Sequence, residues 1–209
     1  MAGKMKSLIK KSLQENPFVY LIIPAIFVCG FFYGTIGVHK LDANQTRDLI
    51  SFVDGFINYL PTASIDASLE TRHALISNLK TLFYIWFLGL TVIGIPLTMV
   101  IVFSRGFILG FTTGFLVQQK SFQGVLVILM TVLPQNLLFI PVLLIAAVSS
   151  ISFSFFVIRG KFAGKTINLS KRFIGYTFSF VILGLFAVLS AFIQGYVSPS
   201  LVKAVFYFT

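Results

Sequence analysis

The sequence has few of the residues from which active sites and metal centres are built. Only 11% of its 209 residues are charged, and it contains six acidic residues, two histidines and one cysteine. A soluble domain typically has about 25% charged residues. One cysteine cannot form a disulfide within the chain, neither His39 nor His73 has a second ligand type four residues away, and no P-loop or Gly-x-Ser-x-Gly motif is present. We therefore expect no catalytic residues, no metal site and no bound cofactor.

The chain is rich in hydrophobic residues instead of charged ones. Hydrophobic residues make up 57% of the chain, and the mean hydropathy is +0.95, whereas a soluble domain is about 45–50% apolar. The apolar runs are continuous rather than alternating, which favours membrane-spanning α-helices over a β-barrel. The sequence therefore predicts an all-α, polytopic membrane protein that forms one integral membrane domain.

About five spans are expected, because one span needs about 20 mostly apolar residues. Four of them cover residues 17–38, 81–103, 136–158 and 173–197. The segment 104–133 is interrupted by polar residues, which leaves two alternatives. It forms either a short third span followed by a helix near the outer surface, or a re-entrant hairpin. The first is favoured, because a hairpin would place the next basic loop outside the cell.

Basic residues indicate the orientation. The net charge is +10, and the basic residues cluster beside the apolar runs, which points to topology signals and anionic lipid rather than to nucleic acid. The basic amphipathic segment 1–16 and the basic loop 159–172 are therefore expected to be cytoplasmic. This orientation places the segment 39–80, which holds five of the six acidic residues, and the tail 198–209 outside.

The outer segment 39–80 contains an amphipathic helix. Its apolar residues follow the i, i+3, i+4, i+7, i+8 pattern: Leu49, Phe52, Val53, Phe56 and Ile57. Such a face must contact the membrane, a neighbouring span or another protein, so these residues are candidate partner-binding residues. The acidic residues of this segment are interpreted as a solvated helix face rather than as a pair for glycoside hydrolysis.

Three glycines mark a packing face. Gly106, Gly110 and Gly114 recur every four residues and therefore share one side of a helix. Small residues allow a second helix to approach closely within lipid. Packing within the protein is the favoured interpretation, and the contact surface of a homodimer is the alternative.

A broken helix is expected at Pro134, Gln135, Asn136 and Pro141. The favoured interpretation is a cap, in which Asn136 accepts the first free amide hydrogens of the fourth span. A site for a ligand or partner is the alternative. Arg105 and Lys120 are placed near the ends of spans, so an ion-coupled transporter has little support.

The chain resembles the stage II sporulation protein M family over essentially its whole length. The similarity is carried by Lys4–Pro17, Phe87–Pro96, Ser104–Phe107 with the glycines that follow, and Leu133–Pro141. The wider family tends to have Pro-His-Gly-x-x-Glu-x-Pro in the last of these segments. In this chain Gln135, Asn136 and Phe139 replace the His, Gly and Glu, so a proton-handling role for that motif does not carry over.

The resemblance implies a non-enzymatic scaffold of a sporulation engulfment complex, in the septal and engulfing membrane between mother cell and forespore. Its implied partners are two single-span peptidoglycan hydrolases, an amidase and a lytic transglycosylase. The alternative function is a permease-like subunit that works with a separate ATPase, which would dock on the basic loop.

Overall fold

The computed structural model describes residues 17–59, 67–162 and 169–198. Its elements in chain order are α2 (Pro17–Gly37), the 3₁₀ turn η1 (Val38–Lys40), α3 (Ala43–Tyr59), α4 (Ala67–Gly89), α5 (Gly94–Val127), the π-helical turn η2 (Ile128–Val132), α6 (Leu133–Phe162), α7 (Leu169–Phe192) and the π-helical turn η3 (Ile193–Val197). No β-strand occurs in these ranges, which confirms the all-α prediction. The predicted segment 1–16 lies outside them, as does all but the first residue of the predicted tail.

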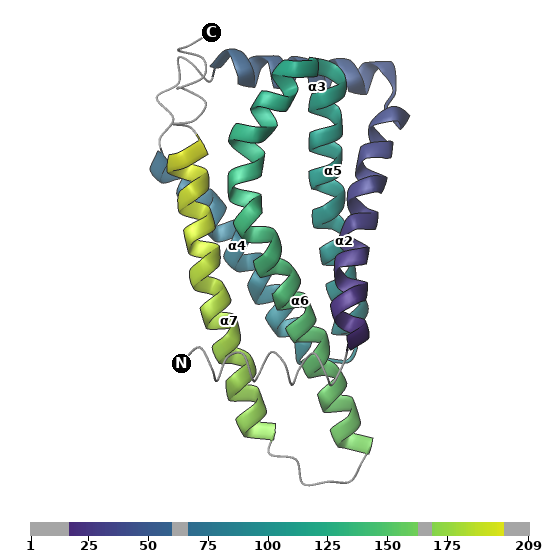
Figure 1. Cartoon of the computed structure of the whole chain (residues 1–209), viewed down its shortest axis with the longest axis vertical. Coiled ribbons are helices and arrows are strands. Elements are labelled where there is room, and N and C mark those ends of the chain that lie inside the picture. Colours follow the sequence, from purple (N-terminus) through teal and green to yellow (C-terminus); the bar gives the residue numbers. More distant parts are fainter. Residues whose placement is uncertain (1–16, 60–66, 163–168, 199–209) are drawn as a thin grey trace.

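The helices α2, α4, α5, α6 and α7 form a bundle along the long axis of the molecule, and α3 lies across one end of it (Figure 1). Three stretches are long and apolar enough to cross a membrane: Pro17–Lys40, Gly94–Ile158 and Leu169–Val197. The second of these contains α5, η2 and most of α6. These stretches agree with an integral membrane protein, and the number of crossings and the orientation stay predictions.

Helix α6 is the centre of the bundle because it contributes to two hydrophobic clusters. Leu143 and Ala146 pack with residues of α4 and α7, and Ala147 and Ile151 pack with residues of α2 and α5. All four side chains are at most 1% exposed. The two alanines matter because small side chains let neighbouring helices approach α6 from both sides.

Helices α2 and α5 are joined by the glycines that the sequence singled out. A Cβ atom at Gly106 or Gly110 would overlap a carbonyl oxygen of α2, and one at Gly114 would lie 3.1 Å from a threonine methyl group of α2. In return, a Cβ at Gly30 or Gly34 would overlap a carbonyl oxygen of α5. The structure thus places this glycine face against a helix of the same chain, which leaves it covered.

The prediction of one continuous helix over residues 81–103 is wrong. Helix α4 ends at Gly89 and α5 begins at Gly94, and the chain turns between them. A Cβ at Gly94 would overlap the Leu88 carbonyl oxygen, so this turn requires glycine there. Pro96 follows in the first turn of α5, where a proline needs no amide hydrogen.

Residues 67–80 are also placed differently from the prediction. The sequence assigns them to the outer segment 39–80, whereas in the structure they form the first half of α4 and pack within the bundle. Ala74 and Asn78 are 4% and 8% exposed. Of the outer segment, η1 and α3 are the described elements that lie at the end of the bundle (Figure 1).

The fold agrees only in part with the alternatives for residues 104–133. Helix α5 continues without interruption to Lys120, and the backbone then reverses at Ser121, where φ is 45° and ψ is −119° (Figure 1). This conformation costs a non-glycine residue about 1–3 kcal/mol. The chain then returns along the bundle into α6. The segment is therefore the end of one long helix and the beginning of the next, and the two form a helical hairpin at Ser121. No separate surface helix occurs among the described residues, and whether the hairpin is re-entrant stays a prediction.

The predicted helix break at Pro134 is wrong as well. The helix continues from η2 into α6, and it contains Pro141 in its interior. Asn136 therefore caps nothing, and its Nδ2 donates to the carbonyl oxygen of Val132 at 2.7 Å. The π-helical turn immediately before Pro134 changes the hydrogen-bond register where the proline lacks an amide hydrogen.

The C-terminal end of α4 is buried, and its carbonyl groups are satisfied by other helices. Three hydroxyl groups of α6 and α7 donate to them: Ser150 to Ile85 at 2.9 Å, Tyr176 to Trp86 at 2.8 Å and Ser154 to Gly89 at 2.8 Å. The last carbonyls of a helix have no partner within the helix. These hydroxyls therefore satisfy carbonyls at the end of α4 where it packs against α6 and α7, while the turn residues Val92 and Ile93 are exposed.

We expect Gly110→Ala to destabilise the protein by about 1–3 kcal/mol, because the added methyl group overpacks the contact between α2 and α5. Thermal unfolding in detergent measures the change. Gly184→Ala is the matched control, since a Cβ at Gly184 has no neighbour within 4 Å. Equal stability of the two variants would contradict the assigned contact.

We expect Ser154→Ala to lower the free energy of unfolding by about 1–3 kcal/mol, because it leaves a buried carbonyl of α4 without a donor. Ser179→Ala is the control: the Ser179 hydroxyl is exposed and donates only to its own helix, at Gly175. Chemical denaturation in mixed micelles compares the two. If the losses were the same, the hydroxyls would not be what stabilises the end of α4.

Candidate functional site

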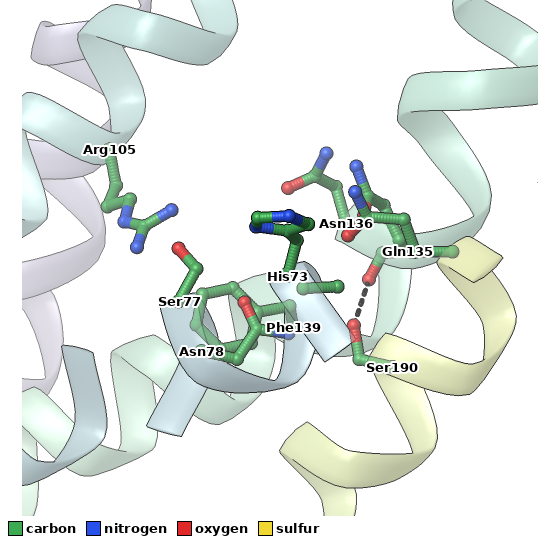
Figure 2. Close-up of a pocket in the computed structure, with 10 residues that line it drawn as sticks. His73, Ser77, Asn78, Arg105, Gln135, Asn136, Phe139 and Ser190 are labelled. Atoms are coloured by element: carbon green, nitrogen blue, oxygen red, sulfur yellow. Dashed lines mark hydrogen bonds between the residues drawn. The ribbon is translucent and has the colours of Figure 1, made fainter. Parts of the chain in front are cut away.

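A polar cavity of about 400 Å³ lies between four helices of the bundle (Figure 2). Its lining residues come from α4, α5, α6, α7 and η3: His73, Ala74, Ser77, Asn78, Arg105, Gln135, Asn136, Phe139, Ser190 and Gln194. Most of these side chains are polar, although the surrounding helices are largely apolar. In a membrane protein, polar and ionisable side chains that lie between the helices are by default a functional-site hypothesis.

Arg105 is not near a helix end, as the sequence suggested, but about three turns into α5. Its Nη2 donates to Oγ1 of Thr81 on α4, and its guanidinium lies 5.6 Å from the ring centroid of Phe139 on α6. A cation over an aromatic face is attracted by the ring quadrupole. These contacts hold the positive charge of Arg105 at the side of the cavity.

No acidic residue lines this cavity in the part of the chain that the structure describes. A charged residue within a membrane helix usually pairs with an opposite charge or with backbone carbonyls. The one ion pair among residues 17–59, 67–162 and 169–198 joins Lys120 to Asp54, at the end of the bundle where α3 lies. The charge of Arg105 is therefore met only by a hydroxyl and an aromatic ring.

The amides of α6 face Arg105 across the cavity. Figure 2 shows Gln135 and Asn136 on one side, Arg105 on the other, and His73 and Ser77 between them in that view. Two π-helical turns adjoin this region, since η2 immediately precedes α6 and η3 contains Gln194. Such turns are frequent at functional sites. Of the two interpretations of this motif, the cap is excluded and the site stays a prediction.

The three positions of the Pro134–Pro141 segment at which this chain departs from the pattern expected of the resembling family all line the cavity. Gln135, Asn136 and Phe139 stand where the family tends to have His, Gly and Glu. Phe139 is also the residue whose ring meets Arg105. The substitutions therefore change the chemistry of one place in the fold rather than scattered positions.

Sequence patterns missed the cavity residues on α4 and α7. His73 and Ser77 are four residues apart, as are Ser190 and Gln194, so each pair shares a helix face. This spacing was a usable signal for two polar faces. It could not show that those faces meet each other and Arg105, because the residues lie on helices far apart in the sequence.

The candidate partner-binding residues lie on α3. Leu49 and Val53 are half-buried, whereas the side chain of Phe52 is 74% exposed. Phe56 and Ile57 belong to the same helix, and their side chains lie outside the described residues. The apolar stripe is thus divided: part of it is covered, and Phe52 points away from the molecule.

Two local contacts fix α3. Before its first turn, the backbone amide of Asp42 donates to Oε1 of Gln45 at 3.2 Å, which is half of a capping box. Further along, Asp54 pairs with Lys120, the last residue of α5 before the chain reverses. The ion pair connects α3 to the helix that carries Arg105.

The described ranges contain no group of three or more His, Cys, Asp or Glu side chains arranged to hold a metal ion. A comparison with protein families matched the model described as Stage II sporulation protein M to residues 23–199. The matched region includes every residue that lines the cavity. Neither a search of curated proteins nor a search of solved structures gave a match.

We expect Thr81→Val to destabilise the protein by about 1–3 kcal/mol, because it removes the hydroxyl that accepts from Arg105 without changing the side-chain shape. Thr98→Val is the matched control: the Thr98 hydroxyl is buried without a hydrogen-bond partner among the described residues, so its removal costs nothing or stabilises. Thermal unfolding in detergent distinguishes them. A loss at Thr98 as large as that at Thr81 would disprove the assigned role of Thr81.

Proposed function

Because the chain belongs to the stage II sporulation protein M family, of sporulation-related membrane proteins, we propose that it is a non-enzymatic scaffold of an engulfment complex. It recruits two peptidoglycan hydrolases, an amidase and a lytic transglycosylase, and positions them at the septal and engulfing membrane of a sporulating bacterium. The hydrolases supply the chemistry of wall remodelling, and this chain supplies their placement.

The observation that carries the proposal is the position of α3. It lies across the end of the bundle (Figure 1), and the side chain of Phe52 on it is exposed. An exposed aromatic ring on a fixed helix is the kind of residue that anchors a protein–protein contact. The capping contact and the ion pair to Lys120 hold this helix in place before a partner arrives.

The proposed orientation places α3 on the wall side. Basic residues follow the 163–168 connection, at Lys171 and Arg172, and precede it in the last turns of α6. The C-terminal end of α6 and the first turn of α7 lie at the end of the bundle opposite α3 (Figure 1). The excess of Lys and Arg in cytoplasmic segments then supports an outer position for α3. Peptidoglycan hydrolases act on that side.

A permease-like subunit that works with a separate ATPase is the second candidate. The polar cavity around Arg105 favours it, since a solute path needs polar groups at this depth. Purification in the presence and absence of nucleotide separates the candidates: an ATPase that co-purifies in a nucleotide-dependent way supports the permease, and the two hydrolases support the scaffold.

We expect Phe52→Glu to reduce co-purification of the amidase and the transglycosylase about tenfold, because a buried, unpaired carboxylate opposes an apolar contact. The variants are expressed in the sporulating host with a tagged chain, and the hydrolases are quantified by immunoblot.

Asn44→Glu is the control, since it adds the same charge to an exposed position of α3 outside the apolar stripe. It should recover both hydrolases at the wild-type level. Wild-type recovery with Phe52→Glu, in a protein that inserts normally, would rule out α3 as the docking helix.

A further inference from the structure

We propose that the cavity between α4, α5, α6 and α7 binds a phosphate group, either a free phosphate or the phosphoryl group of an anionic lipid. The site is formed by Arg105 together with the amides and hydroxyls around it. This inference does not depend on the scaffold function, and it would hold equally for a permease-like subunit.

The positive charge of Arg105 is the first reason to expect an anion in this cavity. A guanidinium cannot lose its proton in a protein, and a buried charge is costly unless a partner compensates it. Thr81 is the only hydrogen-bond acceptor of this guanidinium within the described ranges, and Phe139 supplies a ring rather than a negative charge. Most of the N–H donors of Arg105 thus remain available toward the cavity. Phosphate matches the forked geometry of these donors.

The other lining residues add hydrogen-bond donors from several directions. Asn78 is 8% exposed, lines the cavity, and makes no side-chain hydrogen bond to another described residue. Gln135 and Gln194 bring further amides from α6 and η3, and Ser77 brings a hydroxyl. A tetrahedral anion with several acceptor oxygens can use donors that converge from four helices. The amide of Asn78 is open to the cavity and therefore available to a ligand or water there.

The size of the cavity fits this ligand class. About 400 Å³ lies within the range of small-molecule sites, roughly 300–1,000 Å³, and is far more than one water molecule needs. It is too small for a whole phospholipid, so a lipid would insert only its phosphoryl group and leave its chains on the bundle surface. The free anion and the lipid therefore present the same chemistry to Arg105.

The test uses the full chain in nanodiscs. In phosphatidylcholine nanodiscs, inorganic phosphate is titrated and the midpoint of thermal unfolding is followed. In a second arm, native mass spectrometry compares how much phosphatidylglycerol and phosphatidylcholine the protein retains. We expect saturable stabilisation by phosphate if the source is free phosphate, or selective retention of phosphatidylglycerol if the source is lipid.

Whichever of the two responses the wild type shows, Arg105→Gln should weaken it about tenfold or more, since it removes a charge-assisted contact. Arg105→Lys should restore part of that response. Arg47→Gln is the control: Arg47 is an exposed arginine of α3 that does not line the cavity and lies outside the basic loop 159–172. No response of the wild type in either arm would overturn the proposal, and so would equal binding by Arg105→Gln and the wild type.

Chemical modification gives a readout that needs no variant, which covers the case in which Arg105→Gln fails to fold. Phenylglyoxal modifies arginine side chains, and mass spectrometry maps the modified positions. Inorganic phosphate or phosphatidylglycerol should protect Arg105 and leave the modification of the exposed Arg47 unchanged. Equal modification of Arg105 with and without both anions would also refute the site.

Discussion

The buried end of α4 is the constraint on which the rest of the bundle depends. The last carbonyls of a helix have no partner within the helix, so where the helix end packs against other helices they need donors from the protein. Ser150 and Ser154 of α6 and Tyr176 of α7 are those donors. They fix α4 against both helices and allow the chain to turn between Gly89 and Gly94. Because α4 ends there, its first half lies in the bundle, and this brings His73 and Asn78 next to α6.

The two sides of α6 differ in how closely they pack, and this difference locates the cavity. On one side, α2 and α5 meet backbone to backbone through glycines such as Gly30 and Gly106, which leaves no free volume. On the other side, long polar side chains of α4, α6 and η3 replace small residues and cannot interdigitate as closely. The cavity lies on this looser side.

Sequence patterns predicted the helices whose ends coincide with a change in polarity. The predicted spans 17–38 and 173–197 largely match α2 and α7 with η3. The span predicted for residues 81–103 is wrong because the run is uniformly apolar. Hydropathy alone does not show the turn that Gly89, Gly94 and Pro96 allow. The sequence predicts Arg105 near a helix end because a charged residue is expected at the end of a span rather than inside it. Its actual surroundings come from Thr81 and Phe139, and no local pattern connects those residues to it.

Arg105 is half-buried, and a charge withdrawn from water offsets its desolvation only with good partners. Thr81 and Phe139 do not supply a negative charge. An anion in the cavity would compensate the charge, and by mass action its binding would stabilise the folded bundle. Helix α5 carries Arg105 at the cavity and Lys120 beneath α3. The proposed phosphate would thus stabilise the helix that also holds the proposed docking surface, which makes the two proposals compatible within one fold.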